Sequence, residues 1–291
     1  MGHVADRPTS WWLAALRKRA TRMSAETLDF STPITWESEE ERIAANHFFN
    51  AAYRAEESGL RQAHDLADDV AKWDPELAEA LRLYGEEEGW HRELLTEFIG
   101  QSGGFIKPMG PTTSTFYKLY KRAERMETIV LTNLMFETIG ATTYRIALRT
   151  ARHQPAVAKM LTILTRDESF HVPLNAHFLR RILERENNGF ASRLRTKVLY
   201  HALTAALVAS AAASRRRALV FDRIPFSQLA AAYAGSLARL FAQAPDLGLS
   251  PLPGLLSLLR VTGAFTETDD PLSIGAAERA VDRDAVAIST L

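Results

Sequence analysis

The sequence predicts an all-α protein built around a four-helix bundle. Alanine, leucine, arginine and glutamate recur throughout the 291 residues, and runs of β-branched residues are scarce, which favours helices. A pattern of acidic residues and histidines also occurs twice, in the same order and with the same spacing. Because 46% of the residues are hydrophobic and 24% are charged, the composition is that of a globular protein with a substantial core.

The predicted elements follow one another with short connections and one long loop. Asp74-Pro75 is a typical helix start, with aspartate as the N-cap and proline in the first helical position. The longest connection, over 100–113, contains several glycines and prolines and is long enough to cross the bundle. The helices are predicted over residues 38–71, 75–99, 114–150, 155–186, 191–217, 225–242 and 253–261.

These elements divide the chain into four parts. An N-terminal extension covers 1–37, the bundle covers 38–188, additional helices packed on the bundle cover 189–265, and a polar tail covers 266–291. The longest apolar run, Val198 to Ala213, is short for a membrane span and rich in alanine, so we expect a buried helix there. The N-terminal segment lacks the order of charges typical of a secretory signal, and we expect a cytoplasmic protein.

The composition excludes several classes of site. The chain has no cysteine, which excludes disulfides, zinc ribbons, rubredoxin sites, iron–sulfur clusters and thiol nucleophiles. The 35 basic and 35 acidic residues balance, which argues against a general nucleic-acid binder. Any metal must therefore be bound by aspartate, glutamate and histidine.

Two E-x-x-H motifs provide such ligands. They are Glu88-Gly89-Trp90-His91 and Glu168-Ser169-Phe170-His171, and an acidic residue precedes each one, Glu87 and Asp167 respectively. Positions i and i+3 share a helix face, so each motif can present a carboxylate and an imidazole to one metal ion. A single match would arise by chance, but two matched copies on predicted helices indicate a metal site.

A lone glutamate accompanies each motif at the same spacing. Glu57 precedes Glu88 by the same number of positions as Glu137 precedes Glu168. The midpoints fall at Lys72-Trp73 and Arg152-His153, where the helix-to-helix turns are predicted, so each hairpin brings its lone glutamate level with its motif. Two such hairpins would surround one point with four carboxylates and two histidines. Glu56 is the alternative to Glu57, although the repeat spacing favours Glu57.

This pattern resembles the ferritin-like superfamily of carboxylate-bridged di-iron proteins, especially its oxygenase and desaturase branch. The resemblance covers about residues 40–186 and implies two iron ions, with manganese as the alternative at one or both positions. It also implies that Glu87 and Asp167 accept the ring N–H of the histidine on the opposite hairpin, which would orient that histidine. The implied metal ligands are Glu57, Glu88, His91, Glu137, Glu168 and His171.

The resemblance further implies a function. It indicates a non-haem di-iron oxygenase or oxidase that activates O2 to hydroxylate or desaturate a small organic or acyl substrate, with no catalytic residues beyond the metal ligands. Electrons would come from an external ferredoxin or reductase. The alternative is a ferroxidase, iron-handling or peroxide-scavenging protein without an organic substrate. We expect no nucleic-acid partner and no membrane span, and we consider a homodimer as the oligomeric state.

Small residues flank the predicted site. Gly85 and Gly89 lie beside one motif, and Gly140 and Ala141 follow Glu137 on the other hairpin. Glycine within a helix costs about 1 kcal/mol relative to alanine, so its presence requires a reason. Space for O2 or substrate and close packing of neighbouring helices are two equally weighted explanations.

Overall fold

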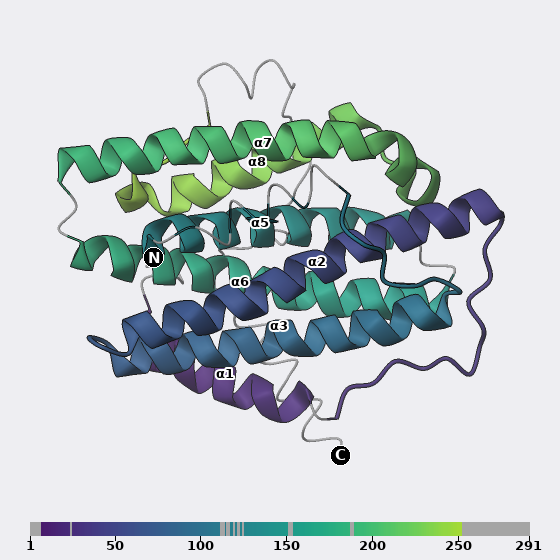
Figure 1. The fold of residues 1–291 in the computed structure, drawn as a ribbon, viewed down its shortest axis with the longest axis horizontal. Helices are drawn as coiled ribbons and strands as arrows, with labels where there is room; N and C mark the ends of the chain where they lie inside the picture. The colour runs from purple at the N-terminus through teal and green to yellow at the C-terminus, as the bar shows by residue number, and fades with distance from the viewer. Residues whose placement is uncertain are drawn as a thin grey trace.

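The computed structural model describes residues 7–23, 25–110, 126–150, 154–186 and 189–251, together with isolated positions between 114 and 125. Every regular element in these residues is helical, which confirms the predicted fold class (Figure 1). The elements are α1 (Thr9–Met23), α2 (Glu39–Val70), α3 (Pro75–Gln101), α5 (Met126–Thr150), α6 (Pro155–Arg185), α7 (Phe190–Asp222), α8 (Phe226–Gln243) and the short 3-10 helix η2 (Pro245–Leu247).

Two helix hairpins form the bundle. Helix α2 packs along α3, and α5 packs along α6, while α2 contacts α5 and α3 contacts α6. The chain crosses from the end of α3 back to the start of α5, so these two helices run parallel (Figure 1). The predicted bundle of two hairpins with a long crossover is confirmed. The second predicted turn, over 151–153, lies outside the described residues.

Local signals in the sequence set where the first hairpin begins and turns. The Ser38 hydroxyl accepts a hydrogen bond from the backbone N–H of Glu41 at 3.1 Å and caps the start of α2. Asp74 accepts from the N–H of Leu77 at 3.0 Å, and Pro75 takes the first position of α3, as predicted. Both capping interactions therefore confirm starts that the sequence predicts.

The predicted single helix over 114–150 is wrong in its continuity, because the described positions 114, 117, 118 and 120 are helical but 123 and 125 are not, and α5 begins only at Met126. The Tyr120 hydroxyl donates to the carbonyl oxygen of Ile129 at 3.2 Å and also contacts Asn133. In one continuous helix the 13 residues between Tyr120 and Asn133 would span about 20 Å. The chain therefore turns back before Met126, and this turn brings Tyr120 beside α5.

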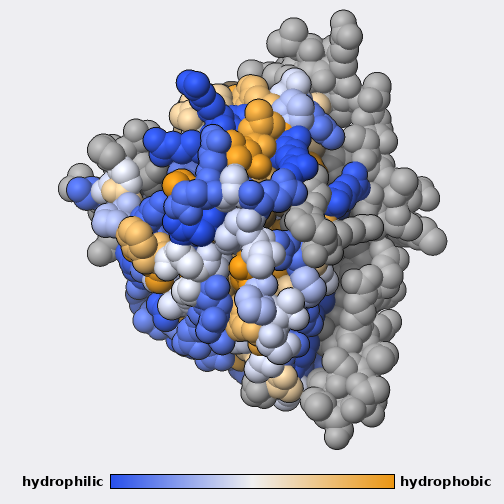
Figure 2. Space-filling view, turned by 90° about the vertical axis from the view of Figure 1, so that its right-hand side faces the viewer, coloured by the Kyte–Doolittle hydropathy of each residue, from blue (hydrophilic) through white to orange (hydrophobic). Residues whose placement is uncertain are grey.

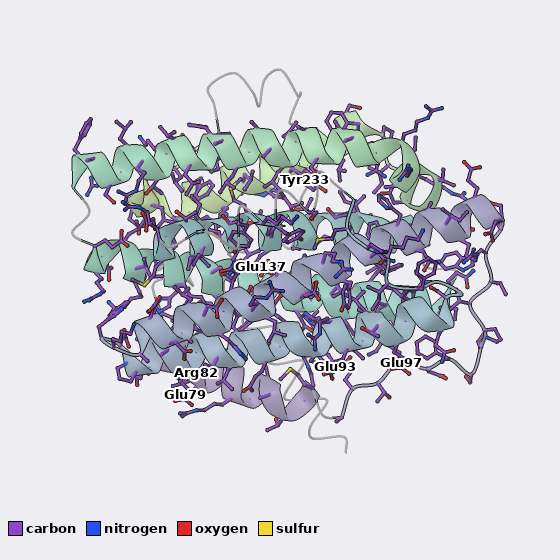
Figure 3. The ribbon with its side chains drawn as sticks, viewed as in Figure 1. Glu79, Arg82, Glu93, Glu97, Glu137 and Tyr233 are labelled. Atoms are coloured by element: carbon purple, nitrogen blue, oxygen red, sulfur yellow. The ribbon has the colours of Figure 1, made fainter. Side chains whose placement is uncertain are left out.

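Further helices cover two opposite sides of the bundle (Figure 1). Helix α1 packs against α3, and its Trp12 ring meets the Phe170 ring of α6 edge-on at 5.5 Å. Helices α7 and α8 pack on the other side, where Ser236 of α8 shares a 2.9 Å hydrogen bond with Thr142 of α5. Figure 3 shows the resulting division of polar groups, since Glu93 and Glu97 lie on the outer side of α3 whereas Glu137 lies inside.

The expectation of a buried helix at Val198 to Ala213 is wrong. These residues belong to α7, and only 11% of the apolar segment Phe190–Ala213 is buried. The physical reason is the position of α7 outside the bundle, where one side of the helix contacts α2 and α5 and the other side is exposed. By length and composition alone, this segment is apolar enough to cross a membrane. The predicted helix over 253–261 and the tail over 266–291 lie outside the described residues.

Candidate metal centre

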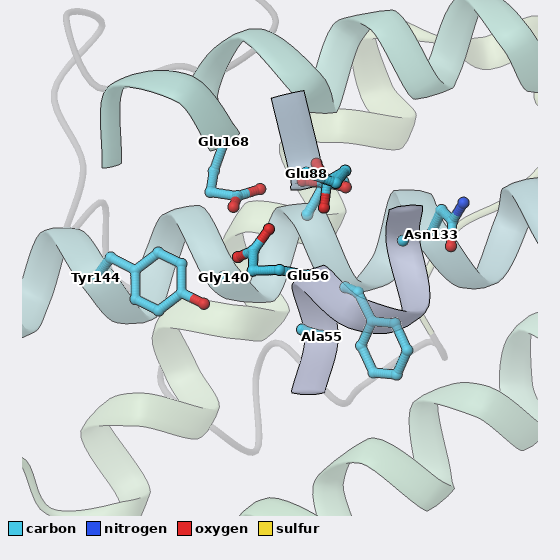
Figure 4. A pocket seen from close by; sticks show the side chains of 10 residues that line it. Ala55, Glu56, Glu88, Asn133, Gly140, Tyr144 and Glu168 are labelled. Atoms are coloured by element: carbon cyan, nitrogen blue, oxygen red, sulfur yellow. The ribbon is translucent and has the colours of Figure 1, made fainter. Parts of the chain in front are cut away.

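Each of the four bundle helices contributes to one buried cluster of carboxylates and imidazoles. The side chains meet near the middle of the bundle, and the carboxylates of Glu56, Glu88 and Glu168 converge in Figure 4. None of the residues in the cluster is more than 5% exposed. The cluster consists of Glu56 from α2, Glu88 and His91 from α3, Glu137 from α5, and Glu168 and His171 from α6.

Both imidazoles present Nδ1 to the carboxylates. In His171, Nδ1 lies 3.0 Å from Glu88 Oε1, 3.5 Å from Glu137 Oε2 and 3.7 Å from Glu168 Oε2. In His91, Nδ1 lies 3.4 Å from Glu56 Oε2. The cluster therefore has two halves, each with one imidazole and carboxylates from the surrounding helices.

The structure places Glu56, not Glu57, in this cluster, which corrects the register favoured by the sequence. Glu57 is 28% exposed and accepts a 2.7 Å hydrogen bond from Arg54. Adjacent helix positions differ by about 100°, so only one of the two glutamates can face the bundle interior. The spacing from Glu56 to Glu88 is therefore one residue longer than the spacing from Glu137 to Glu168. The structural repeat is inexact, and the exact repeat in the sequence misled the prediction.

The outer nitrogen of each imidazole faces an acid from the opposite hairpin. His91 Nε2 lies 3.1 Å from Asp167 Oδ2, and His171 Nε2 lies 3.5 Å from Glu87 Oε2. Such carboxylates fix the ring orientation and leave the other nitrogen available as a ligand. The arrangement orients Nδ1 of both histidines towards the interior of the cluster.

Two buried arginines from α1 hold these outer acids, and the sequence analysis missed them. Arg19 donates from Nη2 to Asp167 at 2.7 Å and from Nε to Glu87 at 3.1 Å. Arg22 donates to Asp167 at 3.1 Å and to Glu87 at 3.4 Å. Their spacing from Trp12 could have revealed them. On a helix this spacing places both arginines on the same inward face as the buried Trp12.

The arginines keep the outer acids ionised. Burial alone would raise the pKa of Asp167, but Arg19 and Arg166 hold it well below its usual range. The same opposition of burial and Arg19 lowers the pKa of Glu87. Two buried negative charges are thus matched by the two α1 cations, with Arg166 adding a third cation at the edge.

Two of the inner carboxylates have the opposite shift, whereas burial would raise the pKa of Glu137 but hydrogen bonds with Glu168 and His171 lower it. Burial and the surrounding carboxylates raise the pKa of both Glu88 and Glu168 well above the usual range. Burial alone would lower the pKa of His91, but Asp167 and Glu56 raise it to about 9. The inner cluster therefore holds excess negative charge that protons partly neutralise, which suits it to bind cations.

Unpaired atoms point to the same conclusion. Among the described residues, Glu88 Oε1 and both ring nitrogens of His171 are buried without a hydrogen-bond partner of good geometry. Of three groups of described residues that each bring three ligand atoms within 4.8 Å of one another, two lie within the inner cluster. They are Glu56, Glu88, His91 and Glu88, Glu137, His171. Since Glu88 belongs to both groups, the donor set would suit a pair of cations.

A pocket lies against the carboxylates on the α2 and α5 side (Figure 4). It encloses about 20 Å³ of space that a water-sized molecule can occupy, and Asn133, Phe136 and Tyr144 of α5 line it together with the four inner carboxylates. Gly140 also lines the pocket, and a Cβ there would be 3.8 Å from the carboxyl carbon of Glu168. This glycine therefore borders space beside the cluster.

Gly85 and Gly59 serve close packing. A Cβ on Gly85 would lie 2.6 Å from Cδ2 of His64, and a Cβ on Gly89 would lie 3.5 Å from Leu60. A Cβ on Gly59, a residue that the sequence analysis did not single out, would clash with Glu88 Oε2 at 2.6 Å. The two explanations for small residues thus apply to different positions, with packing at Gly85 and space at Gly140, whereas Gly89 has room for a Cβ in ordinary contact with Leu60.

Comparison with known proteins identifies structural neighbours only. No protein-family model matches the chain, and no curated protein matches it in sequence. Two solved structures with similar folds are single-residue variants of an R2-like ligand-binding oxidase with an aerobically reconstituted Mn/Fe cofactor. One covers 83% of this chain and 94% of its own, with 16% identity and a TM-score of 0.54. The other covers 97% and 93%, with 14% identity and a TM-score of 0.51. The predicted ferritin-like fold is confirmed.

Proposed function

We propose that this chain is a dimetal oxidase that uses O2 to oxidise a small organic or acyl substrate. The observation that carries the proposal is the pocket, because the carboxylates of the candidate metal ligands form one of its walls. A buried metal pair that borders a pocket with an apolar side can act on a molecule held there. The R2-like oxidases with similar folds support an oxidase, since they carry an Mn/Fe cofactor.

The proposed ligand set is Glu56, Glu88, His91, Glu137, Glu168 and His171. Oxygen and imidazole donors without sulfur suit iron or manganese. When bound, a pair of iron ions, or one manganese and one iron, would supply the electrons and the binding position for O2 activation. If all four inner carboxylates are ionised, their four negative charges equal the four positive charges of two divalent ions.

The surrounding residues would keep this donor set in place. Arg19 and Arg22 neutralise Glu87 and Asp167, so the metal ions would balance only the negative charges of the inner carboxylates. Tyr84 donates a hydrogen bond to Glu137 from a fully buried position. Because burial and the nearby glutamates raise the pKa of Tyr84, it stays protonated and remains a donor.

The pocket would set how the substrate lies. Asn133 accepts a hydrogen bond from Tyr120, which fixes the amide, and Phe136 provides an apolar ring. Burial and neighbouring carboxylates raise the pKa of Tyr144, so its hydroxyl is a neutral donor. One polar end and an apolar wall suit a small organic or acyl molecule with a polar group. Electrons would come from an external ferredoxin or reductase, because the chain has no cysteine for an iron–sulfur cluster.

Anaerobic metal loading followed by exposure to O2 tests the proposal. The protein is loaded with iron, or with manganese and iron, and O2 uptake is measured with and without small carboxylic and acyl compounds. We expect uptake of about one O2 per metal pair and faster turnover with an electron donor and a suitable compound. Continued iron uptake with growth of a ferric mineral would instead support a ferroxidase and contradict the proposal.

A further inference from the structure

The outer face of α7 carries an exposed apolar stripe. Phe190, Leu194 and Val198 are 83%, 50% and 62% exposed, and their spacing of four residues places them on one side of the helix. Large apolar side chains so exposed in a row indicate a surface that meets an apolar partner. The stripe continues along α7 as exposed small and β-branched residues: Ala202, Ala205, Ala206, Val208, Ala209, Ala212 and Ala213.

The rest of the visible surface differs from this stripe. Helix α7 is the outermost described element on the side of the bundle opposite α1 (Figure 1). At the end of the molecule seen in Figure 2, hydrophobic residues form small groups separated by hydrophilic ones. Among the described residues, five of the eight exposed large hydrophobic side chains lie on α7.

Charge identifies the kind of partner. From Phe190 to Phe221 the sequence contains no aspartate or glutamate. Arg193 and Lys197 are exposed among the three large apolar residues, and Arg216 and Arg217 are exposed near the other end of the helix. The apolar stripe therefore has exposed cations near both ends, which fits a surface that is apolar inside and negatively charged outside.

A second copy of the chain fits this face poorly. In an antiparallel pair of α7 helices, Arg193 and Lys197 would meet Arg216 and Arg217 of the other copy. In a parallel pair each basic group would meet its own counterpart. Since the face has no acidic residue to compensate, both arrangements bring like charges together.

We propose that the outer face of α7 binds an anionic lipid bilayer, with the helix lying in the interface. Phe190, Leu194 and Val198 would enter the acyl region, and the exposed cations would contact lipid phosphates. The helix does not cross the bilayer, because its inner side is part of the fold. Arg195 of that side pairs with Glu127 of α5, and the ring of Tyr200 is 5.1 Å from that of Phe241 of α8.

Co-sedimentation of the full chain with vesicles tests the proposal. Vesicles of phosphatidylcholine alone are compared with vesicles that contain phosphatidylglycerol, at low and high salt. We expect binding to the anionic vesicles at low salt, and at least a tenfold loss of binding in the triple variant Phe190→Ser, Leu194→Ser, Val198→Ser. The matched control is Phe105→Ser, which removes a 65% exposed aromatic residue outside α7 and should bind as the wild type does.

A second variant and a second measurement keep the outcomes distinct. Arg193→Gln with Lys197→Gln leaves the apolar stripe intact and should weaken binding to anionic vesicles and reduce its salt dependence. Sedimentation velocity gives the oligomeric state of every variant. The proposal is overturned by absence of binding to anionic vesicles, by binding that both sets of substitutions leave unchanged, or by a dimer that the triple variant converts to monomers.

Discussion

The two sides of the carboxylate cluster differ in charge pairing and in the space beside them. On the α1 side, Arg19 and Arg22 are buried against Glu87 and Asp167, so every group is held by an opposite charge. On the α2 and α5 side, Gly140 leaves a pocket against the carboxylates. One side therefore orients the side chains of the cluster, whereas the other borders open space, for which we propose a role in access.

The outer helices repeat this contrast. Helix α1 turns charged side chains inward and uses them within the bundle, whereas α7 exposes apolar side chains on its outer face. The rule that charges lie outside and apolar residues inside fails for both helices. The inward charges of α1 lie beside the candidate metal centre, and the exposed apolar side chains of α7 form the proposed lipid-binding face.

The largest expected effect comes from the α1 side. Arg19→Ala leaves Glu87 and Asp167 with one fewer buried partner, and we expect the free energy of unfolding to fall by about 3–5 kcal/mol. Chemical denaturation measures it. The control Arg17→Ala removes the exposed ion pair with Glu79 and should cost less than about 1 kcal/mol.

A double variant separates lost charge compensation from lost packing. Arg19→Met with Glu87→Gln removes one buried cation together with one of its anions. If charge compensation is the role of Arg19, this pair should recover more than half of the stability lost in Arg19→Met alone. Equal stability of the double variant and Arg19→Met would show that packing of the guanidinium, which lies over the Phe170 ring, accounts for the effect.

The pocket side predicts a functional loss without loss of metal. Gly140→Leu extends a side chain into the space beside Glu168 and should reduce O2 uptake and azide binding by about tenfold or more, equivalent to about 1.4 kcal/mol. Gly89→Ala, whose Cβ would make an ordinary contact with Leu60, should leave both properties unchanged. If Gly140→Leu binds azide as the wild type does, small molecules do not reach the metal centre from this side.

Metal loading should depend on pH in a defined direction. Below about pH 9 the metal-free His91 holds a proton, and the raised pKa values of Glu88 and Glu168 add further bound protons. Because a metal ion must displace these protons, its apparent affinity should rise with pH up to about 9, by about tenfold per pH unit for each proton released. Calorimetry in buffers of different ionisation enthalpy counts the protons, and loading without proton release would contradict this electrostatic account.

The smallest expected effect is at Glu57. Glu57→Gln removes an ion pair with Arg54 on the partly exposed side of α2 and should cost less than about 1 kcal/mol, with no change in metal content. Glu56→Gln replaces a cluster carboxylate and should weaken metal binding. The metal content of these two variants tests directly which glutamate of α2 is a ligand. Loss of metal in Glu57→Gln but not in Glu56→Gln would support the exact repeat spacing of the sequence.

Much of the fold could be predicted from the sequence because its signals are local. Capping at Ser38 and Asp74 sets the starts of α2 and α3, and i,i+3 spacing sets the face of each E-x-x-H motif. The choice between Glu56 and Glu57 could not be predicted, because helix rotation depends on packing of the whole hairpin.

Other features depend on contacts that are distant in the sequence. Arg19 lies 148 residues from Asp167, so its role appears only when α1 is placed against α6. The start of α5 at Met126 depends on Tyr120 folding back onto Asn133, which no glycine or proline marks. The exposure of α7 follows from its position as an outer layer, since its composition alone is that of a buried helix.

The metal content of purified, iron-loaded protein tests the central claim most directly. Elemental analysis should give about two ions per chain for the wild type and for Glu57→Gln, with a large loss in Glu88→Ala and His171→Ala. Thermal melts of the metal-free variants confirm that they are folded. A wild-type protein that binds no metal, or folded Glu88→Ala and His171→Ala variants that keep both ions, would contradict the account.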